Sequence, residues 1–234
     1  KVMIQDLILP TQTGLYYGGS WHDGQSGMAR DVINPATGEV LTSIVMAGEA
    51  DVEAAIASAR LGFEAWRDVP PLERGKILRE MAAIIRVHGK ELSLLDAADG
   101  GNPVSELDRD VANTVAEIEY FAGLIMEMKG ASTPPTPGVV NFSVRQPLGV
   151  VARIVPFNHP FMFCAAKSVA PLAAGNSVVV KPPEPLSNKE CCPPVIILSE
   201  HTGFAIKSSI SGTVKSGNGN IGSNAAKPPL ESTP

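Results

Sequence analysis

The sequence of 234 residues has little of what marks disulfide-rich, nucleic-acid-binding or membrane proteins. Its three cysteines, Cys164, Cys191 and Cys192, do not suggest a disulfide framework, and they favour a reducing, cytoplasmic setting. The net charge of −5 gives no reason to expect a nucleic-acid partner. No apolar run is long enough for a membrane span, and the first ten residues lack the features of a secretory signal. We therefore expect a soluble globular protein with no membrane or nucleic-acid partner.

Two further absences limit the chemistry. The four histidines, His22, His88, His159 and His201, are scattered without ligand spacing, so no metal site is predicted. The glycine fingerprint GxGxxG of ordinary dinucleotide-binding domains is also missing. Spacing alone therefore gives only weak support for a nucleotide.

The most informative stretch is a predicted strand, helix and strand over residues 149–184. A β-branched apolar run at 150–155 predicts a buried strand, which Pro156 ends because proline has no N–H to donate. Residues 161–174 are almost all apolar, which is typical of a helix covered on most sides. A second buried strand follows at 177–180, with Lys181 at its carboxyl end. The strands of such a unit are parallel, and ligands bind outside their carboxyl ends.

The rest of the first 150 residues is predicted to be scaffold. Apolar spacing of about 3.6 residues predicts four amphipathic helices, and we expect most of their charges to be solvated. Short alternating runs bounded by glycine predict strands, which form a small antiparallel element near the N-terminus. The predicted helices are 49–66, 72–88, 91–98 and 105–129, and the predicted strands are 15–21, 31–35, 39–47 and 139–145.

Four motifs in order resemble the aldehyde dehydrogenase superfamily: YYGGSWHDG, VINPATGEVL, IVPFNHP and PLAAGNSVVVKPPE. The resemblance runs from about Tyr16 to Ser187. It implies an aldehyde-dehydrogenase-like variant Rossmann fold of the α/β class, with an incomplete parallel sheet and N-terminal helices. Residues 1–187 would be the N-terminal part of the cofactor-binding domain, including a β-ribbon arm at about 132–150. In that family the arm reaches a neighbouring subunit, so a homo-oligomer is implied.

The resemblance also implies the site residues. Asn158 matches an asparagine whose amide helps to form the oxyanion hole, whereas the residues alone favour a turn asparagine that bonds its own backbone. Lys181 and Glu184 match the pair that holds the adenosine ribose, and a carboxylate there repels a 2′-phosphate, so NAD is preferred to NADP. The other implied cofactor contacts are Ile154, Val155, Pro156, Phe157 and Pro183.

No nucleophile is assigned. Cys164 lies in the apolar helix, where a small buried hydrophobe is the common role of cysteine, and the flanks of Cys191 and Cys192 match no family motif. Lys167 matches a lysine near the family's active site, but it can equally extend to the surface. His159 is interpreted as a turn residue.

The pattern changes after Ser187. Two prolines exclude a helix interior near residue 193, residues 195–198 allow a short strand, and the composition beyond residue 208 is typical of disorder. We therefore expect residues 188–234 to be a non-family tail, largely disordered, on a truncated or aberrant product. The strand at 177–180 would then lack its next neighbour and promote aggregation.

Three functions follow from these expectations. The first is NAD-dependent oxidation of a small-molecule aldehyde to a carboxylic acid, with an activity that this chain lacks on its own. The alternative is an inactive remnant that at most associates with full-length homologues. A reductive relative that uses NADPH is disfavoured by Asn158 and Glu184.

Overall fold

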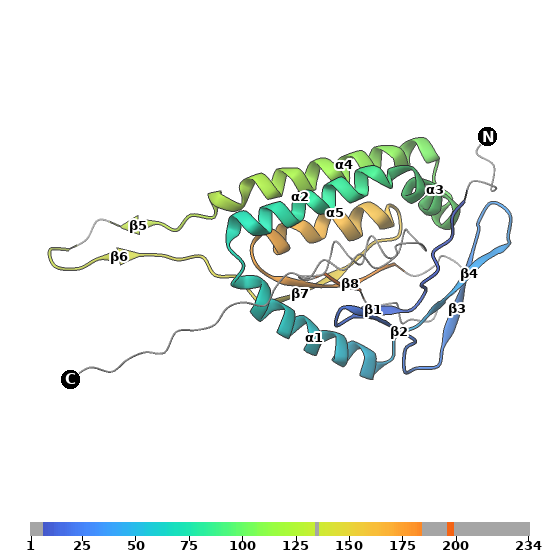
Figure 1. Ribbon diagram of the computed structural model, residues 1–234, viewed down its shortest axis with the longest axis horizontal. Helices are drawn as coiled ribbons and strands as arrows, with labels where there is room; N and C mark the ends of the chain where they lie inside the picture. The colour runs from blue at the N-terminus through green and yellow to red at the C-terminus, as the bar shows by residue number, and fades with distance from the viewer. Residues whose placement is uncertain (1–6, 134–135, 184–195, 199–234) are drawn as a thin grey trace, which may run out of the picture.

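A five-stranded sheet in the order β2-β1-β9-β8-β7 runs through the body of the molecule (Figure 1). The computed structural model describes residues 7–133, 136–183 and 196–198. Two further pairs, β3 with β4 and β5 with β6, are antiparallel hairpins. The strands are β1 (Leu15–Tyr17), β2 (Ser20–His22), β3 (Ala29–Ile33), β4 (Val40–Val45), β5 (Ser132–Thr133), β6 (Asn141–Phe142), β7 (Val150–Ile154), β8 (Ser177–Lys181) and β9 (Ile196–Leu198).

The helices confirm the predicted scaffold, although their first and last residues differ from the predicted bounds by a few positions. The predicted fourth helix ends earlier than expected, at Leu124, and continues as a short 3₁₀ turn. None of the described helices combines the length and apolarity needed to cross a membrane. The helices are α1 (Glu49–Arg67), α2 (Pro71–Val87), α3 (Gly89–Gly100), α4 (Val104–Leu124), η2 (Ile125–Glu127) and α5 (Pro160–Ala173).

The predicted strand, helix and strand unit is present as β7, α5 and β8. The two strands are parallel, and their register pairs Val150 with Ser177 and Ile154 with Lys181. The ladder extends one residue further, because the Val155 N–H donates to the Lys181 carbonyl at 3.0 Å. Helix α5 ends at Ala173, and Gly175 follows two residues later with a φ of +89°, the left-handed conformation that glycine adopts readily after a helix. The carboxyl ends of β7 and β8 therefore lie side by side, as the sequence predicts.

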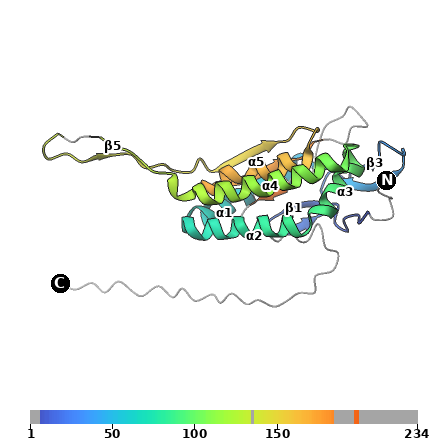
Figure 2. The same cartoon turned by 90° about the horizontal axis from the view of Figure 1, so that it is seen from above.

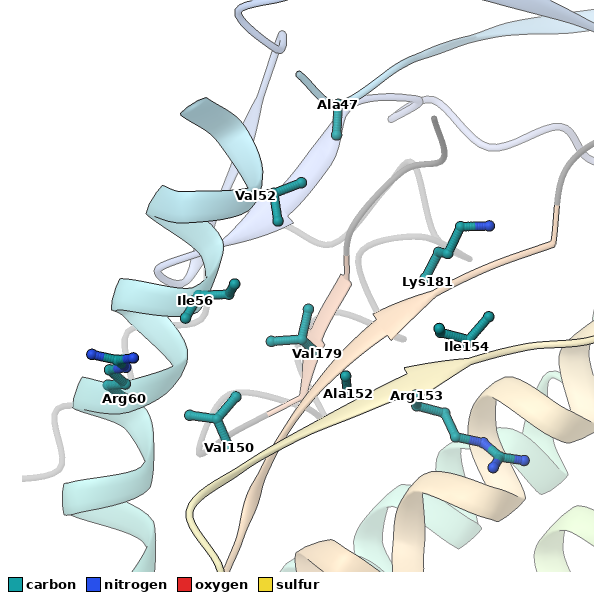
Figure 3. A pocket seen from close by; sticks show the side chains of 10 residues that line it. All are labelled: Ala47, Val52, Ile56, Arg60, Val150, Ala152, Arg153, Ile154, Val179 and Lys181. Carbon is teal, nitrogen blue, oxygen red and sulfur yellow. The ribbon is translucent and has the colours of Figure 1, made fainter. Parts of the chain in front are cut away.

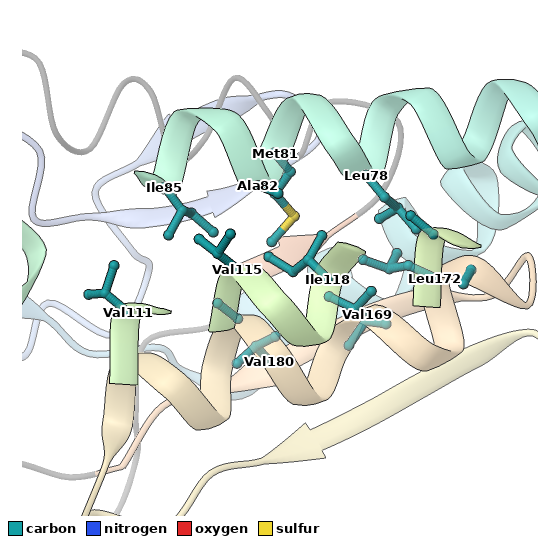
Figure 4. Close-up of a cluster of buried hydrophobic side chains, with 14 of the residues drawn as sticks. Leu78, Met81, Ala82, Ile85, Val111, Val115, Ile118, Val169, Leu172 and Val180 are labelled. Carbon is teal, nitrogen blue, oxygen red and sulfur yellow. The ribbon is translucent and has the colours of Figure 1, made fainter. Parts of the chain in front are cut away.

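The alternating side chains of β8 divide the core into two layers. Val178 and Val180 are buried with α2, α4 and α5, whereas Val179 packs against the smaller cluster formed by β1 and α1. Figure 4 shows the larger layer, in which α2, α4 and α5 interdigitate above the strand. Its fully buried members include Met81, Ile118 and Val169. Helix α1 and helix α5 thus cover opposite faces of the β7–β8 pair.

The expectation that β8 lacks a neighbour is wrong. Strand β9 pairs antiparallel with β8, with Val179 opposite Ile197, and parallel with β1, with Tyr16 opposite Ile196. The predicted short strand at 195–198 therefore fills the position beside β8. The sheet is mixed rather than parallel, because only β7 with β8 and β1 with β9 run in the same direction. The rest of the tail that was predicted to be disordered lies outside the described residues.

The predicted antiparallel pair around Gly38 is confirmed, whereas the strand predicted over 15–21 is divided into two short strands, β1 and β2, that pair with each other. Strands β1 and β2 are joined by Gly18 and Gly19, whose φ values of 61° and 77° suit the tight turn that a two-residue hairpin requires. Strands β3 and β4 pair over five positions around the turn that contains Gly38. The first hairpin forms one end of the five-stranded sheet, and the second is a separate two-stranded sheet.

Strands β5 and β6 form a ribbon that projects away from the body (Figure 2). Only two residue pairs form its ladder, Ser132 with Phe142 and Thr133 with Asn141, so the predicted strand at 139–145 is shorter than expected. The base of the ribbon is held by hydrogen bonds from Arg145 Nε to the Lys129 carbonyl and from the Ala131 N–H to Ser143 Oγ. The exposed apolar side chains along and beside it are Val139, Val140, Phe142, Val144 and Leu148.

Candidate functional site

A cavity of about 450 Å³ lies between α1 and the face of the sheet opposite α5 (Figure 3). This volume falls within the range of small-molecule sites. The lining is mainly aliphatic, with three cationic side chains and no carboxylate. The residues that line it are Ala47, Val52, Ile56, Arg60, Val150, Ala152, Arg153, Ile154, Val179 and Lys181.

Strands β7 and β8 and helix α1 build this cavity through the regular spacing of their side chains. Alternation along β7 and β8 directs Val150, Ala152 and Val179 to the face opposite α5. On α1, residues four apart share one side, so Val52 and Ile56 turn toward the strands. Figure 3 shows Arg153 extending from β7 toward the helices of the other layer. The cavity is therefore an apolar slot with cationic groups around it.

Two predicted cofactor residues meet at this slot. Ile154 and Lys181 are paired in register at the ends of β7 and β8, and both line the cavity. Ile154 is 71% exposed and Phe157 is 61% exposed, so both present apolar surface at this end of the sheet. Lys181 is not without a partner, because it also makes a polar or electrostatic contact within the chain.

The other predicted cofactor residues are placed differently. The side chain of Val155 is buried in the larger core, so only its backbone can face a ligand. Pro156 is exposed and Pro183 is half-buried. Glu184 lies outside the described residues.

Asn158 lies in the exposed turn between β7 and α5. Its main-chain carbonyl accepts a 2.8 Å hydrogen bond from Asn102 Nδ2. Within residues 7–133, 136–183 and 196–198 no hydrogen bond involves its side-chain amide. The alternative interpretation, a turn asparagine bonded to its own backbone, is therefore not observed, and the amide is available as a donor.

A group of acidic side chains beside this turn was missed. Asp110 Oδ2 lies 2.6 Å from His159 Nδ1, with the Asp110 side chain only 9% exposed. Asp96 is buried, and burial together with Asp99 raises the pKa of Asp96 to about 6, although the backbone N–H of Phe161 acts in the opposite direction. The sequence does carry a signal: Asp110 falls on the apolar stripe of α4, among Leu107, Val111, Thr114, Val115 and Ile118.

The remaining candidates have structural partners. Lys167 forms an ion pair with Glu117 of α4 at 2.7 Å, and its side chain is exposed. Burial raises the pKa of the Cys164 thiol to about 12, with the charge of Asp96 adding to the rise. This thiol is therefore protonated at neutral pH, in agreement with its expected role as a small hydrophobe. Cys191 and Cys192 lie outside the described residues.

No metal centre is found in the part of the chain that the structure describes, because no group of three or more His, Cys, Asp or Glu side chains there can hold an ion. The site is thus an apolar slot with cationic groups around it, and four residues beyond Ile154 the side-chain amide of Asn158 has no hydrogen-bond partner among the described residues. Such a site can accept a ligand with a flat apolar part and an anionic part, and can donate a hydrogen bond to a developing negative charge.

Both the sequence and the fold are similar to those of known proteins. The model of the aldehyde dehydrogenase family matches residues 21–189. Aldehyde dehydrogenase tropH of Talaromyces stipitatus is 40% identical over 184 residues, which are 76% of this chain and 36% of that protein. The crystal structure of PnpE with nicotinamide adenine dinucleotide is 38% identical, with a TM-score of 0.71 over 73% of this chain and 35% of PnpE. The crystal structure of an NADP-dependent enzyme of E. coli is 32% identical, with a TM-score of 0.71 over 74% of this chain and 36% of that enzyme. The chain spans about a third of the length of these relatives.

Proposed function

Since this chain belongs to the aldehyde dehydrogenase family, we propose that its slot and the Asn158 turn are the N-terminal part of a site for NAD-dependent oxidation of an aldehyde to a carboxylic acid. One observation carries the proposal. Ile154 and Lys181 pair in register at the carboxyl ends of two parallel strands, and both line the apolar cavity. Ligands of α/β sheets bind at this edge.

The residues present fit an adenine dinucleotide. The aliphatic lining suits the adenine ring, and the cations Lys181 and Arg60 suit hydroxyl and phosphate oxygens. Ile154, Pro156, Phe157 and Pro183 would add apolar contacts, with Val155 contributing through its backbone. When bound, NAD supplies the hydride acceptor of the oxidation.

The choice between NAD and NADP rests on Glu184 in this proposal. A carboxylate accepts hydrogen bonds from the ribose hydroxyls and repels a 2′-phosphate. Asn158 would donate its amide hydrogen bond to the oxygen of the aldehyde as negative charge develops there. Its exposure and its free amide support that role.

We further propose that the chain does not oxidise aldehydes by itself. The described thiol, Cys164, has a pKa of about 12 and is unsuited to attack. The specific observation that favours the alternative, an inactive partner of full-length homologues, is the projecting ribbon with its exposed Val140 and Phe142. The cytoplasmic location stays a prediction.

Titration of the purified chain with NAD and NADP tests the cofactor role. We expect NAD to bind weakly and NADP more weakly still. Lys181→Ala should weaken NAD binding, and Glu184→Gln should reduce the preference for NAD over NADP. The matched control is Lys76→Ala, which breaks only a surface pair with Glu73 on α2. Tighter binding of NADP than of NAD would contradict the role given to Glu184.

Aldehyde oxidation and association need separate assays. The chain should reduce no NAD with short, long or aromatic aldehydes, and turnover that disappears on Cys191→Ser or Cys192→Ser would refute that expectation. Light scattering should detect association that Phe142→Asp abolishes. The control is Val87→Asp, because Val87 is also a mostly exposed apolar residue, at the end of α2. Equal masses for wild type and Phe142→Asp would argue against association through the ribbon.

A further inference from the structure

The turn that carries Asn158 is fastened to the hairpin of α3 and α4 at three points. Asn102, in the loop between these helices, donates to the Asn158 carbonyl at 2.8 Å. Asp110 of α4 contacts the ring of His159, the next residue along the chain, at 2.6 Å. Asp96 of α3 faces the backbone N–H of Phe161, in the first turn of α5. The contacts reach across the turn from residue 158 to residue 161.

The contact between Asp110 and His159 is short, at 2.6 Å, and it joins a nearly buried carboxylate to the ring. A carboxylate is an acceptor, so His159 Nδ1 carries the proton and donates it. The Asp110 side chain is 9% exposed and that of His159 is 34% exposed, so the bond is largely shielded from water. A charge-assisted hydrogen bond of this length in a shielded place is worth more than a surface ion pair. Nε2 has no hydrogen-bond partner in the part of the chain that the structure describes.

The start of α5 depends on the same hairpin. His159 is the residue before the helix, and its own side chain does not make the usual cap bond to the first turn. Pro160 occupies the first helical position and donates no N–H. Asp96 places a carboxyl group near the backbone N–H groups of the first turn of α5, which have no partner within the helix. Negative charge is favourable at this end of a helix. The hairpin therefore sets where α5 begins, and with it the direction of the preceding turn.

We propose that Asp110, acting through His159, and Asn102 are positioning residues for the side-chain amide of Asn158. The proposal rests on the proposed function, in which this amide stabilises a developing oxyanion. Such a donor is effective only if its direction is fixed before the reaction, and an exposed turn cannot fix it without supporting contacts. Asn102 fixes the main chain of Asn158, and Asp110 fixes the residue that follows. Neither Asn102 nor Asp110 lines the cavity.

Nuclear magnetic resonance of the ¹⁵N-labelled full chain tests the proposal. In the wild type we expect His159 to show the Nδ1–H tautomer, and the Asn158 side-chain amide to show the heteronuclear NOE of a rigid group. Asp110→Asn should move the ring toward the tautomer mixture of free imidazole and make the Asn158 amide mobile. Amide hydrogen exchange at residues 157–159 and at Phe161 should rise roughly tenfold in Asp110→Asn and in Asn102→Ala.

The matched control is Asp108→Asn, two residues away on the same helix. Asp108 bonds Ser93 and Lys90 and makes no contact with the turn. A rigid Asn158 amide in Asp110→Asn, or the same change in Asp108→Asn, would overturn the proposal, as would an Nε2–H tautomer in the wild-type chain. The wild-type measurement needs no variant to fold. Failure of NAD to bind while the Asn158 amide stays rigid would instead refute the proposed function.

Discussion

The indole N–H of Trp66 donates a 2.8 Å hydrogen bond to the main-chain carbonyl of Leu172, and both residues are almost fully buried. This bond ties the end of α1 to the end of α5. Because these helices cover opposite faces of β7 and β8, it links the two core layers and supports one wall of the slot. The Leu172 carbonyl also accepts from the Gly175 N–H at 3.0 Å, so it keeps one partner when the indole is removed.

Trp66→Phe should therefore destabilise the chain by roughly 1–3 kcal/mol, from the lost hydrogen bond and the smaller ring. Urea unfolding followed by circular dichroism measures this change. The control is Leu61→Ala on the same helix, which should stay within about 0.5 kcal/mol because the Leu61 side chain is mostly exposed. Equal midpoints for Trp66→Phe and wild type would show that this contact does not link the layers.

Asp96 should make the chain less stable as pH rises from about 4 to about 6. Its folded pKa of about 6 lies above the ordinary value of 3.8, so the unfolded chain loses this proton first. At neutral pH the ionised, buried carboxylate costs up to about 3 kcal/mol. Asp96→Asn should thus raise the free energy of unfolding at pH 7.5 and have much less effect at pH 4.

Asp108→Asn is the control, because its effect on stability should depend on pH in the opposite direction. The hydrogen bond from Ser93 lowers the pKa of Asp108, with Lys90 adding to the effect, so its stabilisation is present above pH 4 and lost as pH falls. We expect this variant to be destabilised at pH 7.5 and unaffected at low pH. The interpretation of Asp96 fails if Asp96→Asn shows no pH-dependent gain.

Cys164 should resist alkylation in the folded chain. With a pKa of about 12, only about one thiol in 10⁴ is ionised at pH 8, and the thiolate is the reactive form. Peptide mass analysis after iodoacetamide treatment should find Cys164 unmodified in buffer and modified in urea. Rapid native labelling of Cys164 would show that its surroundings are more polar than the packing against α2 and α4 indicates.

Local patterns predicted most of the fold. The strand ends at Ile154 and Lys181 followed from β-branched runs that stop at proline or lysine, and the parallel pairing followed from the helix between them. Both features depend on residues close in sequence, which is why the shared edge of the sheet could be found without coordinates.

Contacts between distant residues could not be predicted in the same way. Asp110 and His159 are 49 residues apart, and the assumption that helix charges are solvated hid the burial of Asp96 and Asp110. The slot also needs α1 on the second face of the sheet, which apolar spacing alone does not assign.

The pairing of β9 was the largest departure from expectation, and it carries the last prediction. A strand between β8 and β1 has hydrogen-bond partners on both sides, so a proline within it removes a donor that one of them needs. Ile197→Pro should therefore unpair β8 opposite Val179, leave a strand edge that promotes association, and speed amide exchange in Ser177–Lys181. Ile221→Pro, in the same C-terminal segment and outside the described residues, is the control. Hydrogen exchange and light scattering measure the two effects. Unchanged exchange in β8 for Ile197→Pro would mean that β9 does not hold this edge, and the aggregation expected of an unpaired β8 should then appear in the wild-type chain itself.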